Sequence, residues 1–156
     1  MRMIVMPEIR EDTPGLYSLT RDWLIMSRKV VMPDVNGAAF RIRRALGGTL
    51  ITVYAYDSTP DNPHCDGVSI FPNRILGVSL LEAAMFHDPW YERLEALAKA
   101  LGWPVWKVRH AGDVIFRELI IETNKGRRMA VPVAWAAYFG VRIFGGIYHW
   151  AHMQTT

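Results

Sequence analysis

The sequence predicts an α+β fold in which a β-rich amino-terminal half packs on a helical carboxy-terminal half. β-branched and aromatic residues form short runs before residue 57, most clearly in 49–56. Prolines and glycines without a clear period occupy 58–78, which predicts a long structured loop. From residue 79 to about 150 the pattern is mostly helical, and we expect two of the helices to pack antiparallel.

Length and composition limit the possible architectures. The chain has 156 residues, enough for a single domain over 1–156 and too few for two. Its net charge of +3 permits contact with phosphate or anionic lipid, and no specific nucleic-acid partner is predicted. Cys65 is the single cysteine, so an internal disulfide is excluded and a reducing compartment is expected. The first residues lack the long apolar run of a signal peptide, so we expect a cytoplasmic product.

Two strand pairs are predicted in the β-rich part. The runs 22–27 and 29–32 are expected to pair, with Pro33 ending the second. Gly47 and Gly48 indicate a turn before the strand at 49–56. The alternating run 40–43 is its expected hairpin partner.

The first helix is predicted from a capping-box pattern. Ser79 is followed three residues later by Glu82, so the helix is expected to begin at Leu80. Its residues are apolar all round, as in a buried helix. We expect it to end at Gly102, with an interruption at Pro89, because an interior proline removes a helical hydrogen bond.

Two further helices follow. One is expected to open at Pro104 and to end near 124–126. The last apolar segment, 129–150, has Arg142 as its single charge and a length near that of a membrane span. Pro132 and several glycines interrupt it, which favours a buried or interfacial helix over a true span.

The candidate chemistry lies on the two middle helices. His87 and Tyr91 share one helical face, and Asp88 lies about a quarter-turn away. If the helices pack antiparallel, Asp113 can reach the ring of His87, and the neighbouring Gly112 allows a close approach. A carboxylate behind an imidazole fixes its tautomer and stabilises its protonated form, which makes it a competent general base.

A structural interpretation is equally available for each of these residues. Asp88 and Pro89 are also a good helix start, with Asp88 as N-cap. His87 can be a hydrogen-bonded core histidine with Asp113 as its structural partner. Spacing alone leaves both interpretations open.

The pattern His-Asp-x-x-Tyr at 87–91, with a later aspartate on a partnering helix, resembles the active site of the phospholipase A2 superfamily. The resemblance implies that His87 activates water, that Asp113 orients His87 and that Tyr91 donates a hydrogen bond to Asp113. It also implies a calcium ion held by Asp88. The acidic loop before this helix, which includes Asp66, is able to supply further oxygen ligands. Calcium would polarise the ester carbonyl and stabilise the oxyanion.

A second resemblance covers more of the chain. The segments 66–72, 83–91, 112–116 and 141–145 are similar to an uncharacterised phage and prophage family. That family shows Thr-Asp-x-Ala-Ser-x-Pro, His-Asp-x-x-Tyr, Ala-Asp-x-x-Phe and a closing apolar helix. It implies a protein of the host cytoplasm or of the phage particle.

Two functions therefore remain open. The first is a calcium-dependent lipid ester hydrolase that acts on phospholipid or at a membrane surface. The second is a non-catalytic phage virion or accessory protein that contacts other phage structural proteins and uses the His-Asp pair structurally. The missing glycine-rich calcium loop and Pro89 favour the second.

Overall fold

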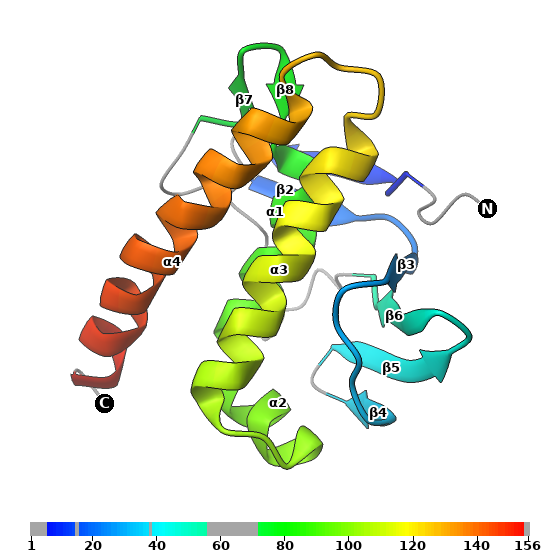
Figure 1. Cartoon of the computed structure of the whole chain (residues 1–156), viewed down its shortest axis with the longest axis vertical. Helices are drawn as coiled ribbons and strands as arrows, with labels where there is room; N and C mark the ends of the chain where they lie inside the picture. The colour runs from blue at the N-terminus through cyan, green and yellow to red at the C-terminus, as the bar shows by residue number, and fades with distance from the viewer. Residues whose placement is uncertain (1–5, 15, 38, 56–71, 155–156) are drawn as a thin grey trace.

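The computed structural model describes residues 6–14, 16–37, 39–55 and 72–154, and within them the fold is α+β (Figure 1). The strands are β1 (Ile9–Thr13), β2 (Leu16–Leu19), β3 (Trp23–Ser27), β4 (Val35–Gly37), β5 (Phe40–Ala45), β6 (Gly48–Val53), β7 (Arg74–Ile75) and β8 (Val78–Ser79). The helices are α1 (Leu81–Glu92), α2 (Leu94–Leu101), α3 (Val105–Thr123) and α4 (Ala130–Gln154). A β-rich amino-terminal half and a helical carboxy-terminal half are both present, as predicted.

The main sheet is antiparallel, with the strand order β3-β6-β5-β4. β5 and β6 form the predicted hairpin, and Gly47 has a φ of +87° at its turn, a conformation that suits glycine. Every second residue of β6 is buried, including Ile51 and Val53, so one face of the sheet lies in the core. The hairpin prediction is confirmed, with the second strand ending at Val53.

The predicted pairing of 22–27 with 29–32 is wrong. β3 pairs with β6 instead, and residues 29–32 form no strand. The hydroxyl of Thr49 donates to the carbonyl of Val30 and accepts from the N–H of Met32, which fixes this loop beside the sheet. Met32 is fully buried. The apolar pattern therefore reflects burial of a loop rather than a strand ladder.

Part of the predicted loop at 58–78 is also ordered differently. β7 and β8 pair as a short antiparallel hairpin, and its turn contains Gly77 at a φ of +80°. Residues 56–71 lie outside the described residues. The loop prediction is therefore corrected only at 74–79.

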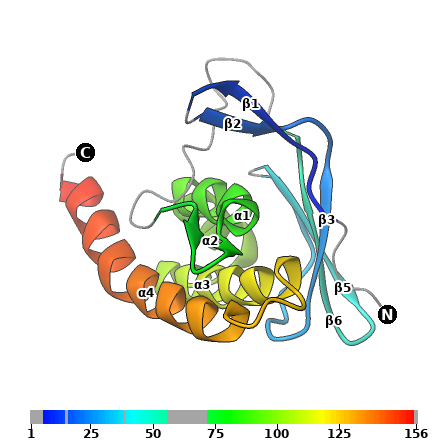
Figure 2. The same ribbon diagram turned by 90° about the horizontal axis from the view of Figure 1, so that it is seen from above.

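The helices form two layers on one side of the sheet. α1 and α3 lie next to the sheet, and α4 covers α3 on the side away from it (Figure 2). Phe40 of β5 places its ring 5.8 Å from that of Phe86 and 5.1 Å from that of Trp90, which joins the sheet to α1. The candidate site lies where side chains of α1, α3 and α4 meet.

 Within the layer next to the sheet, α1 and α3 pack antiparallel. The N–H of Ser79, just before α1, donates to Oδ1 of Asn124 at the end of α3 over 2.8 Å, and Asn124 Nδ2 donates back to the carbonyl of Ser79 over 2.7 Å. At the other end of the pair, Trp90 Nε1 donates to the carbonyl of Val108 over 2.9 Å. The start of α1 thus meets the end of α3, as predicted.

Gly112 allows α1 and α3 to approach closely. A Cβ atom at Gly112 would lie 2.3 Å from Cδ1 of Trp90, far inside van der Waals contact. The sequence-based expectation that Gly112 makes room for another helix is confirmed. The indole of Trp90 fills that room.

The boundaries of the first helix differ from the prediction. α1 begins at Leu81, and Ser79 donates a side-chain hydrogen bond to Glu82 Oε2 over 2.5 Å without capping a backbone N–H. Pro89 lies inside α1, and the break falls at Arg93. The residue after Pro89 is the fully buried Trp90, whose packing on β5 and α3 holds the helix together through the proline.

The later helix boundaries agree with the prediction more closely. Gly102 ends α2 in the left-handed conformation, and Asn124 ends α3. α3 begins at Val105, one residue later than expected, and Pro104 is its N-cap residue. Among the described residues, no helix is long and apolar enough to cross a membrane.

Candidate functional site: a carboxylate shared by three helices

The centre of the candidate site is the contact between His87 on α1 and Asp113 on α3. Nε2 of His87 lies 2.8 Å from Oδ1 of Asp113, which is fully buried. Because a carboxylate only accepts, Nε2 carries the hydrogen in this bond, and Nδ1 of the neutral ring keeps a lone pair. The predicted contact between the two side chains is confirmed.

Tyr91, one turn after His87, also binds Asp113. Its hydroxyl donates to Oδ1 over 2.6 Å, which is the contact expected from the sequence. Burial raises the pKa of the Tyr91 hydroxyl, and the neighbouring charge of Asp113 raises it further. The Tyr91 hydroxyl therefore keeps its proton and donates to Asp113 at neutral pH.

Arg142 on α4 supplies the third partner. Its Nη1 donates to Oδ2 of Asp113 over 2.9 Å, and 28% of its side chain is exposed. Asp113 thus accepts from side chains on α1 and on α4 while it sits on α3. This arrangement satisfies both oxygens of a buried carboxylate, which would otherwise be costly to desolvate.

Sequence reasoning missed Arg142 as a partner of Asp113. The signal was present, because Arg142 is the single charge in the apolar segment 129–150. A charge in such a segment needs a partner of opposite charge. Among the described residues, Asp113 is the fully buried carboxylate. The close approach of α4 is made possible by Gly145, where a Cβ atom would lie 2.9 Å from the hydroxyl oxygen of Tyr91.

Aromatic rings fix the orientation of His87. The imidazole centroid lies 4.2 Å from the ring of Tyr91 and 4.6 Å from that of Phe116. The side chain keeps 9% of its surface exposed. Nε2 is the ring nitrogen that binds Asp113, so Nδ1 is the ring nitrogen left for a second partner. It is the ring atom that can receive a proton from water.

The expected calcium ligands are not brought together by the described residues. Asp88 follows His87 on α1 and is partly exposed, and Asp66 lies outside the described residues. Nowhere in 6–14, 16–37, 39–55 and 72–154 do three His, Cys, Asp or Glu side chains gather to hold a metal ion. Of the two expected ligands, the described residues include only Asp88. No step of the chemistry is assigned to calcium.

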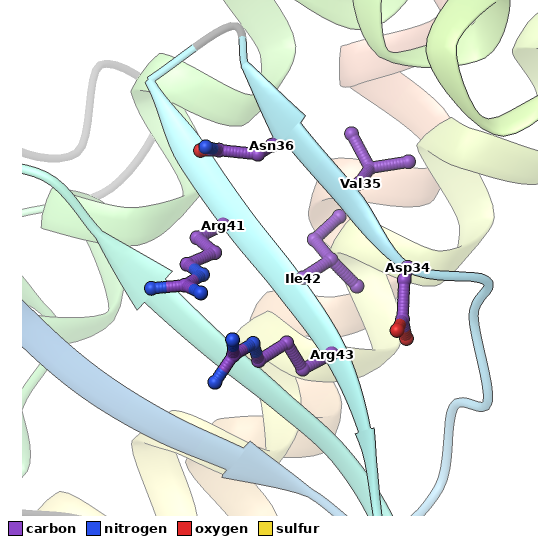
Figure 3. Close-up of a pocket in the computed structure, with 6 residues that line it drawn as sticks. All are labelled: Asp34, Val35, Asn36, Arg41, Ile42 and Arg43. Atoms are coloured by element: carbon purple, nitrogen blue, oxygen red, sulfur yellow. The ribbon is translucent and has the colours of Figure 1, made fainter.

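A pocket of about 230 Å³ lies elsewhere, on β5 and the edge strand β4 of the main sheet (Figure 3). It is lined by Asp34, Val35, Asn36, Arg41, Ile42 and Arg43. Figure 3 shows Arg41 and Arg43 extending from the same side of β5. None of the residues around Asp113 lines this pocket, so it is separate from the candidate site.

Comparison with known proteins leaves the site to be interpreted from its geometry. The chain matches no protein-family model, no curated protein and no solved structure.

Proposed function

We propose that the protein is a hydrolase of lipid esters in which His87 is the general base. The observation that carries this proposal is the 2.8 Å bond between Nε2 of His87 and the buried Asp113, with Tyr91 on the same carboxylate oxygen. This bond leaves Nδ1 with the lone pair that a general base needs. Phospholipid is the proposed substrate class, in keeping with the resemblance to the phospholipase A2 superfamily.

The reaction follows from this geometry. Nδ1 of His87 takes a proton from water as the water oxygen attacks the ester carbonyl carbon. Asp113 stabilises the imidazolium through its bond to Nε2, and Tyr91 and Arg142 hold Asp113 in place. The proton on Nδ1 then passes to the departing alkoxide as the carbon–oxygen ester bond breaks. The products are a fatty acid and an alcohol, and the imidazole is neutral again.

Calcium remains part of the proposal on narrower grounds. Asp88 would be one ligand and Asp66 a second, with loop carbonyls completing the set. A metal ion that binds only the folded protein raises its melting temperature. We expect millimolar calcium to do so in the wild type and not in Asp88→Asn. If calcium leaves the melting temperature of both unchanged, the calcium part of the proposal falls while the His87 part stands.

The His87 part is tested by release of fatty acid from phospholipid mixed micelles. His87→Gln is the informative variant, because its amide can still donate to Asp113 but cannot act as a base. We expect at least about a hundredfold loss of rate, with a melting temperature within a few degrees of the wild type. His110→Gln, which changes an exposed histidine of α3, is the matched control and should keep the wild-type rate. Hydrolysis by His87→Gln at the wild-type rate would contradict the proposal.

A second candidate function is favoured by a different observation. Asp113 joins α1, α3 and α4 through three side-chain bonds, so the same residues can serve as a structural link. In that case the protein is a non-catalytic phage virion or accessory protein that contacts other phage structural proteins, in the particle or in the host cytoplasm. Absence of fatty-acid release from the wild type, with and without calcium, would favour this candidate.

A further inference from the structure

The outward face of α4 is apolar. Four residues spaced by four, Val131, Trp135, Phe139 and Ile143, are between 42% and 60% exposed. The opposite face packs on α3 and is buried; it contains Ala130, Val133, Ala134, Ala137 and Val141. Figure 2 shows α4 as the outermost helix, on the side of the molecule away from the sheet. Exposed apolar residues that follow one helical stripe indicate a contact surface.

The stripe has an aromatic cluster at its centre. The ring centroids of Trp135, Tyr138 and Phe139 lie within 5.9 Å of one another. The guanidinium of Arg117, from α3, lies 4.0 Å from the ring centroid of Trp135 and 4.6 Å from that of Tyr138. Amphipathic aromatic rings beside a long cationic side chain are typical of the boundary between water and lipid.

The segment that contains this face has only positive charges. After Glu122 the sequence contains four of the 18 Lys and Arg residues and none of the 15 Asp and Glu residues. Three of the four, Lys125, Arg127 and Arg128, are exposed just before α4 begins. These side chains follow the end of α3, where cations suit the helix dipole, and precede the start of α4, where they oppose it. Their charge is available to an anionic partner.

We propose that α4 docks on an anionic lipid surface, lying in the plane of the interface. The docking face consists of Val131, Trp135, Phe139 and Ile143, with Lys125, Arg127 and Arg128 at its amino-terminal end. One side of α4 is packed on α3, so the helix presents only its outer side to lipid. The apolar stripe enters the acyl boundary, and the basic residues meet the headgroups.

A second copy of the chain fits this face less well. Two copies that meet along α4 would bring together segments with Lys and Arg and no Asp or Glu. No charge on one copy would be complementary to the basic end of the other. An anionic lipid surface supplies both the apolar layer and the opposite charge. This docking goes beyond the proposed hydrolysis, because it requires no chemistry at His87.

The apolar part is tested by flotation with vesicles of ether-linked phosphatidylglycerol and phosphatidylcholine, which have no acyl ester to hydrolyse. The wild type should float with these vesicles and not with pure ether-linked phosphatidylcholine. Phe139→Ser with Ile143→Ser should lower partitioning by at least about tenfold. Leu46→Ser, at the fully exposed turn between β5 and β6, is the matched control and should bind as the wild type does.

The basic part is tested by charge reversal. Arg127→Glu with Arg128→Glu should also lower partitioning at least about tenfold and should weaken its salt dependence. Arg43→Glu with Arg44→Glu makes the same change on β5 and should leave binding much closer to the wild type.

Three results would overturn the docking proposal. They are a wild type that does not bind anionic vesicles, α4 variants that bind as well as their controls, and a wild-type dimer that the Phe139→Ser and Ile143→Ser changes dissociate. The last result would assign the face to a second copy. Because the vesicles hold no acyl ester, each result is independent of whether the protein hydrolyses lipid acyl esters.

Discussion

Two of the three carboxylates on helix α3, Asp113 and Glu118, lie five residues apart and face different sides of the helix. Asp113 faces α1 and α4 and accepts from His87, Tyr91 and Arg142. Glu118 faces the sheet, where it accepts from the hydroxyl of Ser27 over 2.6 Å and from the N–H of Arg28 over 3.2 Å. Both carboxylates are satisfied, but one has charged and titratable partners and the other has neutral ones.

The difference shows how the partners decide what a buried acid can do. Burial raises the pKa of Glu118, and its hydrogen bonds to Ser27 and Arg28 only partly oppose this. Glu118 links α3 to the end of β3. Its two hydrogen-bond partners, a serine hydroxyl and a backbone N–H, do not exchange a proton with it near neutral pH. Asp113 contacts an imidazole directly. The α1–α3–α4 side of the helix is therefore suited to proton transfer, and the sheet side to structure.

The largest expected effect comes from removing the shared carboxylate. Asp113→Ala leaves Arg142 and His87 without their buried acceptor, so we expect a loss of about 3–5 kcal/mol in the free energy of unfolding. For a chain of this size, that is a fall of roughly 10 °C in the melting temperature. Glu118→Ala, the matched change on the sheet side, should cost less than half as much, because it strands no charge. Equal losses in chemical denaturation would remove the distinction between the two sides.

A smaller effect is expected when one bond to Asp113 is lost. Tyr91→Phe keeps the ring beside His87 and Gly145 but removes the donor, at a cost of about 1 kcal/mol. Asp113 still accepts from His87 and Arg142 in this variant. Urea denaturation measures the free energy of unfolding of Tyr91→Phe. Tyr17→Phe, which changes a tyrosine of β2, is the control. A Tyr91→Phe variant as stable as the wild type would show that the hydroxyl adds nothing to the network.

The smallest effect is a dependence on pH at the sheet side. Because its pKa is raised, Glu118 binds a proton more readily in the folded state than in the unfolded state. The stability that this proton binding contributes is present at low pH and is lost as the pH rises through the raised value. Glu118→Gln removes this loss. We expect the stability of Glu118→Gln relative to the wild type to increase from pH 4.5 to neutral pH, as measured by melting temperatures across that range. A constant difference would contradict the raised pKa.

The parts of the fold that sequence predicted well are those specified by local pattern. The β5–β6 hairpin follows from alternation around Gly47 and Gly48, and the end of α2 follows from Gly102. The pairing of β3 could not be found in this way. It depends on the buried side chain of Thr49 holding residues 30–32 in a loop, which is a long-range contact.

Pro89 and Arg142 show the same limit at the site. The propensity of proline to break a helix was outweighed by the packing of Trp90, which no local pattern reports. His87, Tyr91 and Asp113 could be placed together because helical spacing and an antiparallel pair fix their faces. Arg142 was marked out by being the single charge of 129–150, but which residue it binds depends on how α4 crosses α3.

The tautomer of His87 is the most direct test of the central claim that Asp113 holds this ring ready to act as a base. A long-range ¹H–¹⁵N correlation spectrum of the histidine side chains, with His87→Gln used for assignment, reports which ring nitrogen carries the hydrogen. For the neutral ring the account predicts a hydrogen on Nε2 and a lone pair on Nδ1. A neutral ring with its hydrogen on Nδ1 would contradict it.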